Sequence, residues 1–253
     1  MDRFLKLLPQ AVANLPNPVR YRAENALTGF ERAKTLLPID REIASFRAIT
    51  AAEEAASALI RSLQLRGYPG AERIDLKRHD HKAAVGFFLD AIRVEITNGG
   101  TLDVTVTLAV DPPKLTVSLP IRQFVRLDDD LQNLHVQFVD PLGWVGTKEG
   151  VEQAQYFDEA VKKVAQSRKV DKLLASLANS RNRILYAHDG GLPRSEATQH
   201  TIEQRERLAV LCIILSVAVL QVEHHQGAAL QCLAGYLKVI RRADASTSMD
   251  SDS

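Results

Sequence analysis

The amino-acid sequence predicts a mainly α-helical protein: a helical bundle with a small inserted antiparallel β-hairpin or sheet. Apolar residues recur every three or four positions through most of the 253-residue chain, the spacing that gives a helix one buried face. Residues 101–119 instead alternate apolar and polar side chains, as a β-hairpin does. Hydrophobic residues make up 45% and charged residues 25% of the chain, which is typical of a globular protein. We therefore expect one bundle domain over residues 21–243, with the β insertion at about 98–145.

The first 20 residues are expected to form a loose N-terminal arm, because they contain three prolines. A helix should follow from about residue 22 to 37, where Pro38 ends it. The next helix is expected to begin at Asp40, a residue type that caps helix N-termini, and to continue to Leu65.

This second helix carries one broad apolar face, which two carboxylates interrupt. The apolar positions are Ile43, Phe46, Ile49, Ala52, Ala56, Leu59, Ile60 and Leu63. Glu53 and Glu54 fall within this pattern, so we expect one of them near the edge of the core. A third helix is expected over about residues 80–94.

The β insertion shows the clearest local pattern. Its alternating apolar positions are Leu102, Val104, Val106, Leu108 and Val110, then Leu115, Val117 and Leu119. Asp111-Pro112-Pro113 lies between the two runs and predicts a turn, and residues 135–139 predict a third short strand. One face of such a hairpin must be covered, so we expect Val104, Val106, Leu108 and Val117 to pack on the bundle.

Helical periodicity resumes at Val151 and continues to about His188, where two glycines end it. A last long helix is expected from about residue 198 to 242, with a bend at Gly227 or Gly235. Residues 244–253 are small and polar, and we expect them to form a disordered tail.

Charge and hydropathy limit the functions that need consideration. The formal net charge is +1, so attraction to nucleic acid requires a local basic patch. The most apolar stretch, residues 208–222, is shorter than the ~20 residues that span a bilayer, so no membrane partner is expected. No secretion signal is evident at the N-terminus, and Cys212 and Cys232 lack metal-ligand spacing. We interpret them as buried thiols and expect a cytoplasmic, reducing location.

The segment most indicative of function contains Arg181 and His188, seven residues apart at the end of a helical pattern. At ~100° per residue, seven steps return to almost the same face of a helix. A guanidinium that holds phosphate oxygens and an imidazole that moves a proton near pH 7 would then share one surface. Arg183 and His188 are ~140° apart on such a helix and would diverge.

The run Arg181-Asn182…His188 resembles the arginine–polar–x–histidine signature of the HEPN superfamily, and the helix at residues 46–67 is similar to an early helix of such bundles. The resemblance covers residues 40–95 and 150–240 and leaves out the β insertion. Many members are metal-independent ribonucleases of toxin and antiphage systems. The resemblance therefore implies a homodimer, RNA as substrate, an antitoxin-like protein partner and no cofactor.

The resemblance also implies roles for single residues. His188 would act as general base or acid, Arg181 would stabilise the phosphoryl oxygens, and Asn182 would hold the phosphate or orient a partner group. As substrate-binding residues, Arg183 would add charge to the RNA cleft and Tyr186 would stack on a base.

Two alternatives remain open at this level. The chain would instead be a non-catalytic module that binds a protein or nucleic acid, with the strand at residues 115–119 as the recognition edge. Separately, His79-Asp80-His81 could supply metal ligands, although an aspartate cap between solvated histidines is the simpler interpretation.

Overall fold

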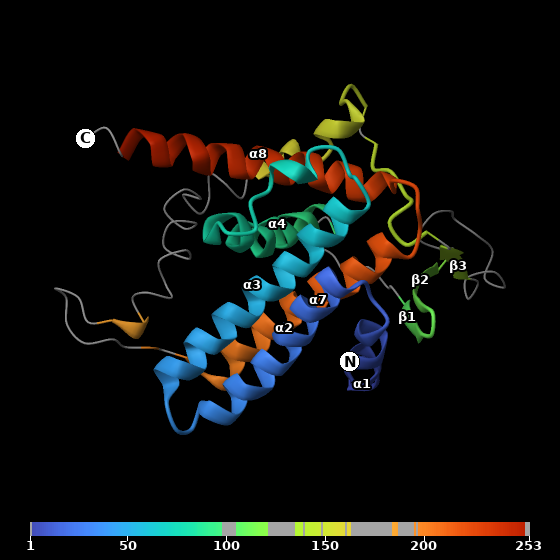
Figure 1. Cartoon of the computed structure of the whole chain (residues 1–253). Coiled ribbons are helices and arrows are strands. Elements are labelled where there is room, and N and C mark those ends of the chain that lie inside the picture. The colour runs from blue at the N-terminus through green and yellow to red at the C-terminus, as the bar shows by residue number, and fades with distance from the viewer. Residues whose placement is uncertain are drawn as a thin grey trace.

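The structure is a computed structural model that describes residues 2–97, 105–120, 135–138, 140–147, 149–159, 161–162, 184–186, 195 and 197–250. Long helices form most of the described chain, and a three-stranded antiparallel sheet lies at one side of them (Figure 1). The expected fold class, mainly α with a small β-sheet, is confirmed.

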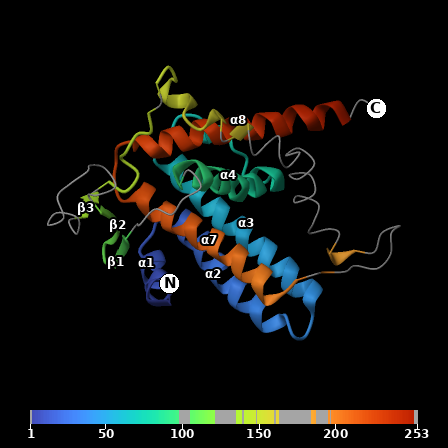
Figure 2. The same ribbon diagram turned by 180° about the vertical axis from the view of Figure 1, so that it is seen from behind.

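The centre of the bundle is formed by α2 (Asn17–Leu36), α3 (Arg41–Leu65) and α7 (Gln199–Leu220), which lie side by side in both views (Figures 1 and 2). Small residues let α2 and α3 approach closely: a Cβ atom on Gly29 would lie 2.7 Å from the Cβ of Ala51. Buried alanines on these two helices include Ala23, Ala26, Ala33, Ala44, Ala48 and Ala55. Asp40 caps α3 as expected, since its Oδ1 accepts a hydrogen bond from the Ile43 backbone N–H at 2.8 Å.

A second layer crosses the central helices. It contains α4 (His79–Thr97) and α8 (Gly227–Asp250), which run at a steep angle to α3 (Figure 1). Phe88 of α4 packs edge-on against Tyr236 of α8 and against Phe157, with ring centroids 5.9 and 6.4 Å apart. A short 3-10 helix, η1 (Ala71–Arg73), lies between α3 and α4, and another, η4 (Gln153–Gln155), precedes Phe157.

The N-terminal residues contradict the expectation of a loose arm. They form a helix, α1 (Asp2–Ala13), and α2 begins directly after Pro16. Leu8, Ala11 and Val12 are completely buried, so the helical spacing of these apolar residues outweighs the presence of Pro9. Pro18 lies in the first turn of α2, where a missing N–H costs little.

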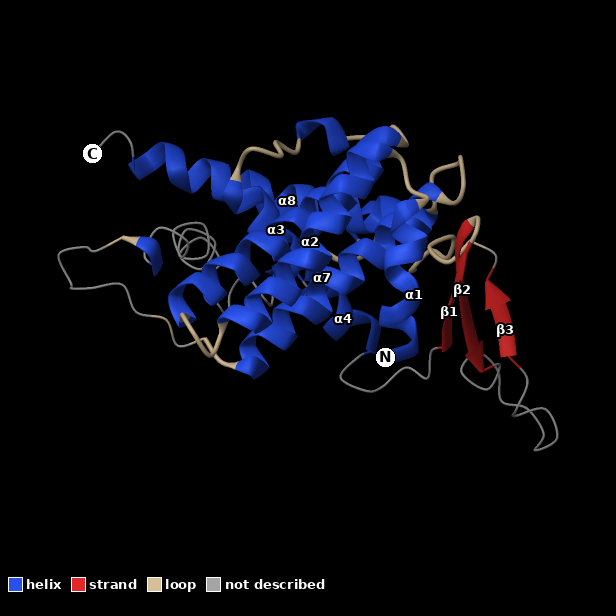
Figure 3. Ribbon diagram, turned by 60° about the horizontal axis from the view of Figure 1, so that its bottom comes forward, coloured by secondary structure: helices blue, strands red, loops and turns tan. Residues whose placement is uncertain are grey.

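The β insertion forms the predicted hairpin and the third strand. Strands β1 (Thr105–Val110), β2 (Pro113–Pro120) and β3 (His135–Phe138) pair in that order, all antiparallel (Figure 3). The strand that contains residues 115–119 is therefore the middle strand of the described sheet. Its proposed role as a recognition edge is wrong, because its neighbours already use its backbone groups.

The hairpin packs on the bundle only near its turn. Leu108 and Leu115 face each other across β1 and β2 and are both buried. The next pair on the same face of the hairpin, Val106 and Val117, is less covered, and Val106 is 40% exposed. The expectation that Val106 packs on the bundle is therefore wrong, and Val104 lies outside the described residues.

The long helix expected over residues 198–242 is broken in two. Helix α7 ends at Leu220 and α8 begins at Gly227, and α8 then continues to Asp250. The expected disordered tail is thus helical as far as Asp250. At the break, a Cβ on Gly227 would lie 2.4 Å from Val145 Cγ2, so only glycine fits there.

A buried glutamine explains the break. Gln226 is 1% exposed, and its side-chain amide and backbone N–H bond to other segments of the chain. Its Oε1 accepts from the Leu142 backbone N–H at 3.0 Å, and its Nε2 donates to the Ala218 carbonyl at 2.8 Å. Its own backbone N–H donates to the Tyr68 hydroxyl at 3.0 Å. An uninterrupted helix would use that N–H internally and could not form this junction.

Two further glutamines bind backbone groups of the insertion and of the loop after it, each through both groups of one residue. The side-chain amide of Gln221 pairs with both backbone groups of Leu115, at 2.7 and 3.1 Å. Gln231 pairs with both backbone groups of Gly146, at 2.9 and 2.8 Å. We call Gln221, Gln226 and Gln231 the glutamine clamps. They attach the insertion and its following loop to the last two helices.

The helix expected over residues 151–188 is described only in fragments. Val151 forms a β-bridge, residues 153–155 form η4, and residues 158–159, 161–162 and 184–185 are helical. The remainder of that prediction lies outside the described residues.

The clamp at Gln226 gives a direct test. In Gln226→Leu the Leu142 N–H and the Ala218 carbonyl would be buried without partners. At about 1–3 kcal/mol for each of the two unsatisfied groups, we expect the free energy of unfolding to fall by about 2–6 kcal/mol. Urea unfolding measures this, with Gln155→Leu on the exposed η4 as the matched control. Equal stabilities of the two variants would contradict the clamp.

Candidate functional site

The expected reaction site is only partly described. Arg181, Asn182, Arg183 and His188 lie outside the described residues, so their positions relative to one another remain a prediction. Tyr186 is described and is 66% exposed. The two residues before it are helical and half-buried, so the segment presents its aromatic ring to solvent while its aliphatic residues are partly covered.

A polar cluster joins α3 to α4. Oε2 of Glu53, on α3, lies 2.9 Å from Nδ1 of His79 and 3.4 Å from Nζ of Lys82, both on α4. The Glu53 and Lys82 side chains are each 10% exposed, and that of His79 is 33% exposed. We call these three residues the Glu53 cluster. A carboxylate, an imidazole and an ammonium group are thus assembled at the edge of the core.

The three side chains of the Glu53 cluster meet because each lies on the face of its helix that is turned toward the other helix. Glu53 lies on the buried face of α3, among alanines that leave room for α4 to approach. His79 and Lys82 are three residues apart, so they share one face of α4. A carboxylate can only accept hydrogen bonds, so it holds the proton of a neutral His79 on Nδ1.

Arg78, just before α4, and Asp80, in its first turn, form a second charged group. Arg78 donates to Asp80 through Nε at 3.0 Å and through a second guanidinium nitrogen, and the His81 N–H donates to the same carboxylate at 2.9 Å. Burial by itself would raise the pKa of Asp80. The hydrogen bonds and the charge of Arg78, together with the His81 N–H, outweigh that effect and hold the pKa below its ordinary value.

The expected interpretation of His79-Asp80-His81 needs correction. Asp80 lies inside the first turn of α4, which begins at His79, and is not its cap. His81 is buried: its Nδ1 accepts from the Asp75 N–H at 3.1 Å, and its carbonyl accepts from the Tyr236 hydroxyl. Burial raises the pKa of Tyr236, which keeps this hydroxyl protonated as a donor.

One member of the Glu53 cluster can be predicted from the sequence. A glutamate within the apolar face of α3 was recognisable as a residue near the core edge. Its partners were not, because nothing in one sequence indicates that the start of α4 lies against the middle of α3. Among the described residues, no three His, Cys, Asp or Glu side chains are grouped closely enough to hold a metal ion.

Comparison of the chain with protein-family models, with curated proteins and with solved structures finds no significant match. No helix in the described part of the chain is long and apolar enough to cross a bilayer. The functional argument therefore depends on the residues themselves.

Glu53→Gln tests whether the cluster is an essential ionic contact. The substitution keeps the side-chain size but leaves the Lys82 ammonium without a carboxylate in a nearly buried position. We expect the free energy of unfolding to fall by about 2–4 kcal/mol, as when one partner of a buried ion pair is removed. Denaturant unfolding should show a much smaller change for the adjacent Glu54→Gln. Equal changes in the two variants would show that the charge of Glu53 has no special role.

Asp80 should contribute to the pH dependence of stability. Its pKa is lower in the folded than in the unfolded chain, so its contribution is present above the unfolded value, about 3.9, and is lost as pH falls through the folded value. We therefore expect wild type to be more stable than Asp80→Asn at pH 7 and this difference to shrink below about pH 4. Urea unfolding between pH 7 and pH 2.5 measures the difference. A gap that stays constant over this range would contradict the assignment.

Proposed function

We propose that this chain is a HEPN-like, metal-independent endoribonuclease in which Arg181, Asn182 and His188 carry the reaction. The support from the described residues is the position of Tyr186. It belongs to the same segment as the three reacting residues, and its ring is 66% exposed. Exposed aromatic rings bind single-stranded RNA by stacking on its bases, so a nucleotide held there would lie next to the reacting groups.

The proposed reaction is an internal phosphoryl transfer. The ribose 2′-oxygen bonds to the adjacent phosphorus while the bond from phosphorus to the 5′-oxygen of the next nucleotide breaks. One group takes the proton from the 2′-hydroxyl and another donates a proton to the leaving 5′-oxygen. Arg181 stabilises the negative charge on the phosphoryl oxygens, and the products are a 2′,3′-cyclic phosphate and a 5′-hydroxyl.

A single His188 supplies one proton carrier, whereas the reaction uses an acid and a base. We therefore propose a two-fold dimer in which the two copies of His188 line one groove. Arg181, Arg183 and their symmetry mates would make that groove basic, although the whole chain has a formal net charge of only +1. RNA would bind to this local patch and not to the protein surface in general.

The test compares RNA cleavage by wild type, His188→Ala and His200→Ala in the presence of a chelator. His200 is an exposed histidine at the start of α7 and bonds to Gln204 on the same helix, so it is a matched control. We expect cleavage products that end in a 2′,3′-cyclic phosphate from wild type and His200→Ala. His188→Ala should lose at least about 100-fold in rate, the usual contribution of a general acid or base.

Unfolding curves for all three proteins establish that they are folded, and sedimentation at micromolar concentration measures the oligomeric state. Cleavage at the wild-type rate by folded His188→Ala would refute the assignment of this residue. A wild-type protein that sediments as a monomer would contradict the shared groove. Failure of wild type to cleave any RNA would favour the non-catalytic binding module.

A further inference from the structure

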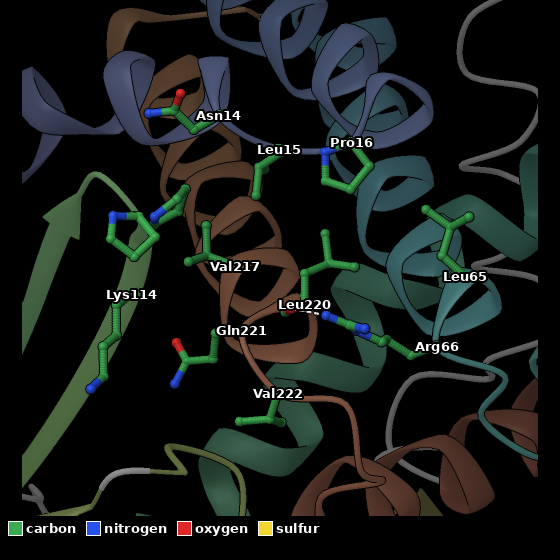
Figure 4. A pocket seen from close by; sticks show the side chains of 12 residues that line it. Asn14, Leu15, Pro16, Leu65, Arg66, Lys114, Val217, Leu220, Gln221 and Val222 are labelled. Atoms are coloured by element: carbon green, nitrogen blue, oxygen red, sulfur yellow. Dashed lines mark hydrogen bonds between the residues drawn. The ribbon is translucent and has the colours of Figure 1, made fainter.

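A cleft of about 640 Å³ lies where the hairpin turn meets the bundle. The C-terminal ends of α1, α3 and α7 border it on the bundle side, and the start of β2 borders it on the other (Figure 4). Pockets of about 300–1,000 Å³ are typical of sites for small organic ligands. The volume is therefore suited to a small molecule.

The walls of the cleft are mainly apolar. Leu65 of α3, Val217 and Leu220 of α7 and Leu15, between α1 and α2, contribute side chains, and prolines add to both sides. Leu65 is 42% exposed, so part of this apolar surface is open to solvent. An apolar ligand body would cover that surface and gain about 25 cal/mol for each Å² removed from water.

Two hydrogen-bonded amides hold the hairpin against the bundle at this point. Gln221 pairs with both backbone groups of Leu115, and Asn14 Nδ2 donates to the Val110 carbonyl at 3.1 Å. These bonds connect the two sides of the cleft directly. The cleft is therefore formed before any ligand arrives, which reduces the entropy cost of binding.

The charged groups at the cleft are both cations. Arg66 and Lys114 lie on opposite sides of it (Figure 4), and none of the described residues that line it is acidic. The Arg66 guanidinium donates to the Leu220 carbonyl at the end of α7. Its Nε is buried and has no hydrogen-bond acceptor among the described residues.

The helix ends oppose part of this positive charge. Each helix C-terminus carries roughly −0.5 of an elementary charge, so three of them offset about 1.5 of the two positive charges. A positive balance of about half a charge remains, which disfavours a cationic ligand and favours an anionic one modestly. The apolar walls must then supply most of the affinity, and the charge selects the head group.

We propose that this cleft binds a small amphipathic carboxylate, with its apolar body on the leucine and valine walls and its carboxylate at the solvent edge, in the positive field of Arg66 and Lys114. This site uses none of the residues proposed for RNA cleavage. The test of ligand binding at this cleft is therefore independent of the test of RNA cleavage.

The experiment is calorimetric titration of the full chain with decanoate, and in parallel with decanol and decylammonium. The three probes have the same apolar body and differ in head-group charge. We expect decanoate to bind most tightly and decylammonium most weakly. Decanol binding as tightly as decanoate would overturn the carboxylate assignment, and absence of decanoate binding would overturn the site.

Matched variants locate the binding. Leu65→Glu and Leu65→Gln change the same half-exposed position, but only the glutamate adds a negative charge to the wall. We expect decanoate affinity to fall about tenfold more in Leu65→Glu than in Leu65→Gln, which corresponds to about 1.4 kcal/mol. Lys114→Gln should weaken decanoate binding about three- to tenfold, whereas the exposed Lys162→Gln, outside the cleft lining, should not change it. Equal affinities of the two Leu65 variants would show that decanoate binds elsewhere.

Discussion

The arrangement of the β insertion depends on hydrogen bonds from side-chain amides to backbone groups. Gln221, Gln226 and Gln231 are spaced five residues apart, and each reaches a different segment of the insertion or of the loop after it. A primary amide presents a donor and an acceptor side by side, so it can pair with the N–H and the carbonyl of one residue as a neighbouring strand would. The bundle thus holds extended chain without adding a strand of its own.

These amides also determine the connection between the last two helices. Gln226 is buried, so its polar atoms must find partners or cost several kcal/mol. The partners include Leu142 and Tyr68, which Gln226 reaches because α7 ends at Leu220 and the chain then turns toward them. Burial of one polar side chain therefore fixes where a helix ends, and with it the angle at which α8 crosses the central helices.

The spacing of apolar residues along the sequence correctly predicts the elements that a local pattern is enough to specify. The helix after Asp40 and the hairpin around Pro112 are local patterns, and both occur where the sequence indicated. The errors arose where distant contacts decide: Leu8 and Val12 draw the proline-containing N-terminus into a helix, and Gln226 interrupts an apolar run. The Glu53 cluster combines both cases. The position of the glutamate near the core can be predicted from the apolar pattern of its helix, whereas its pairing with Lys82 depends on how α3 and α4 pack. All three residues proposed for catalysis, and Arg183 among those proposed for substrate binding, lie outside the described part of the chain. That site therefore remains a prediction from sequence.

The glutamine clamps have a consequence for how this chain can vary between relatives. Each clamp binds peptide groups and not side chains, so its hydrogen bonds do not require a particular residue type at the position that they hold. Leu142 could be replaced by many residues without loss of its bond to Gln226. Gly146 is an exception, since a Cβ there would lie 2.5 Å from the ring of Tyr156. Leu115 is a second exception, since its side chain is buried in the core. Sequence change in the insertion should therefore concentrate at positions such as Leu142, where the clamp binds the peptide group and leaves more choice of side chain.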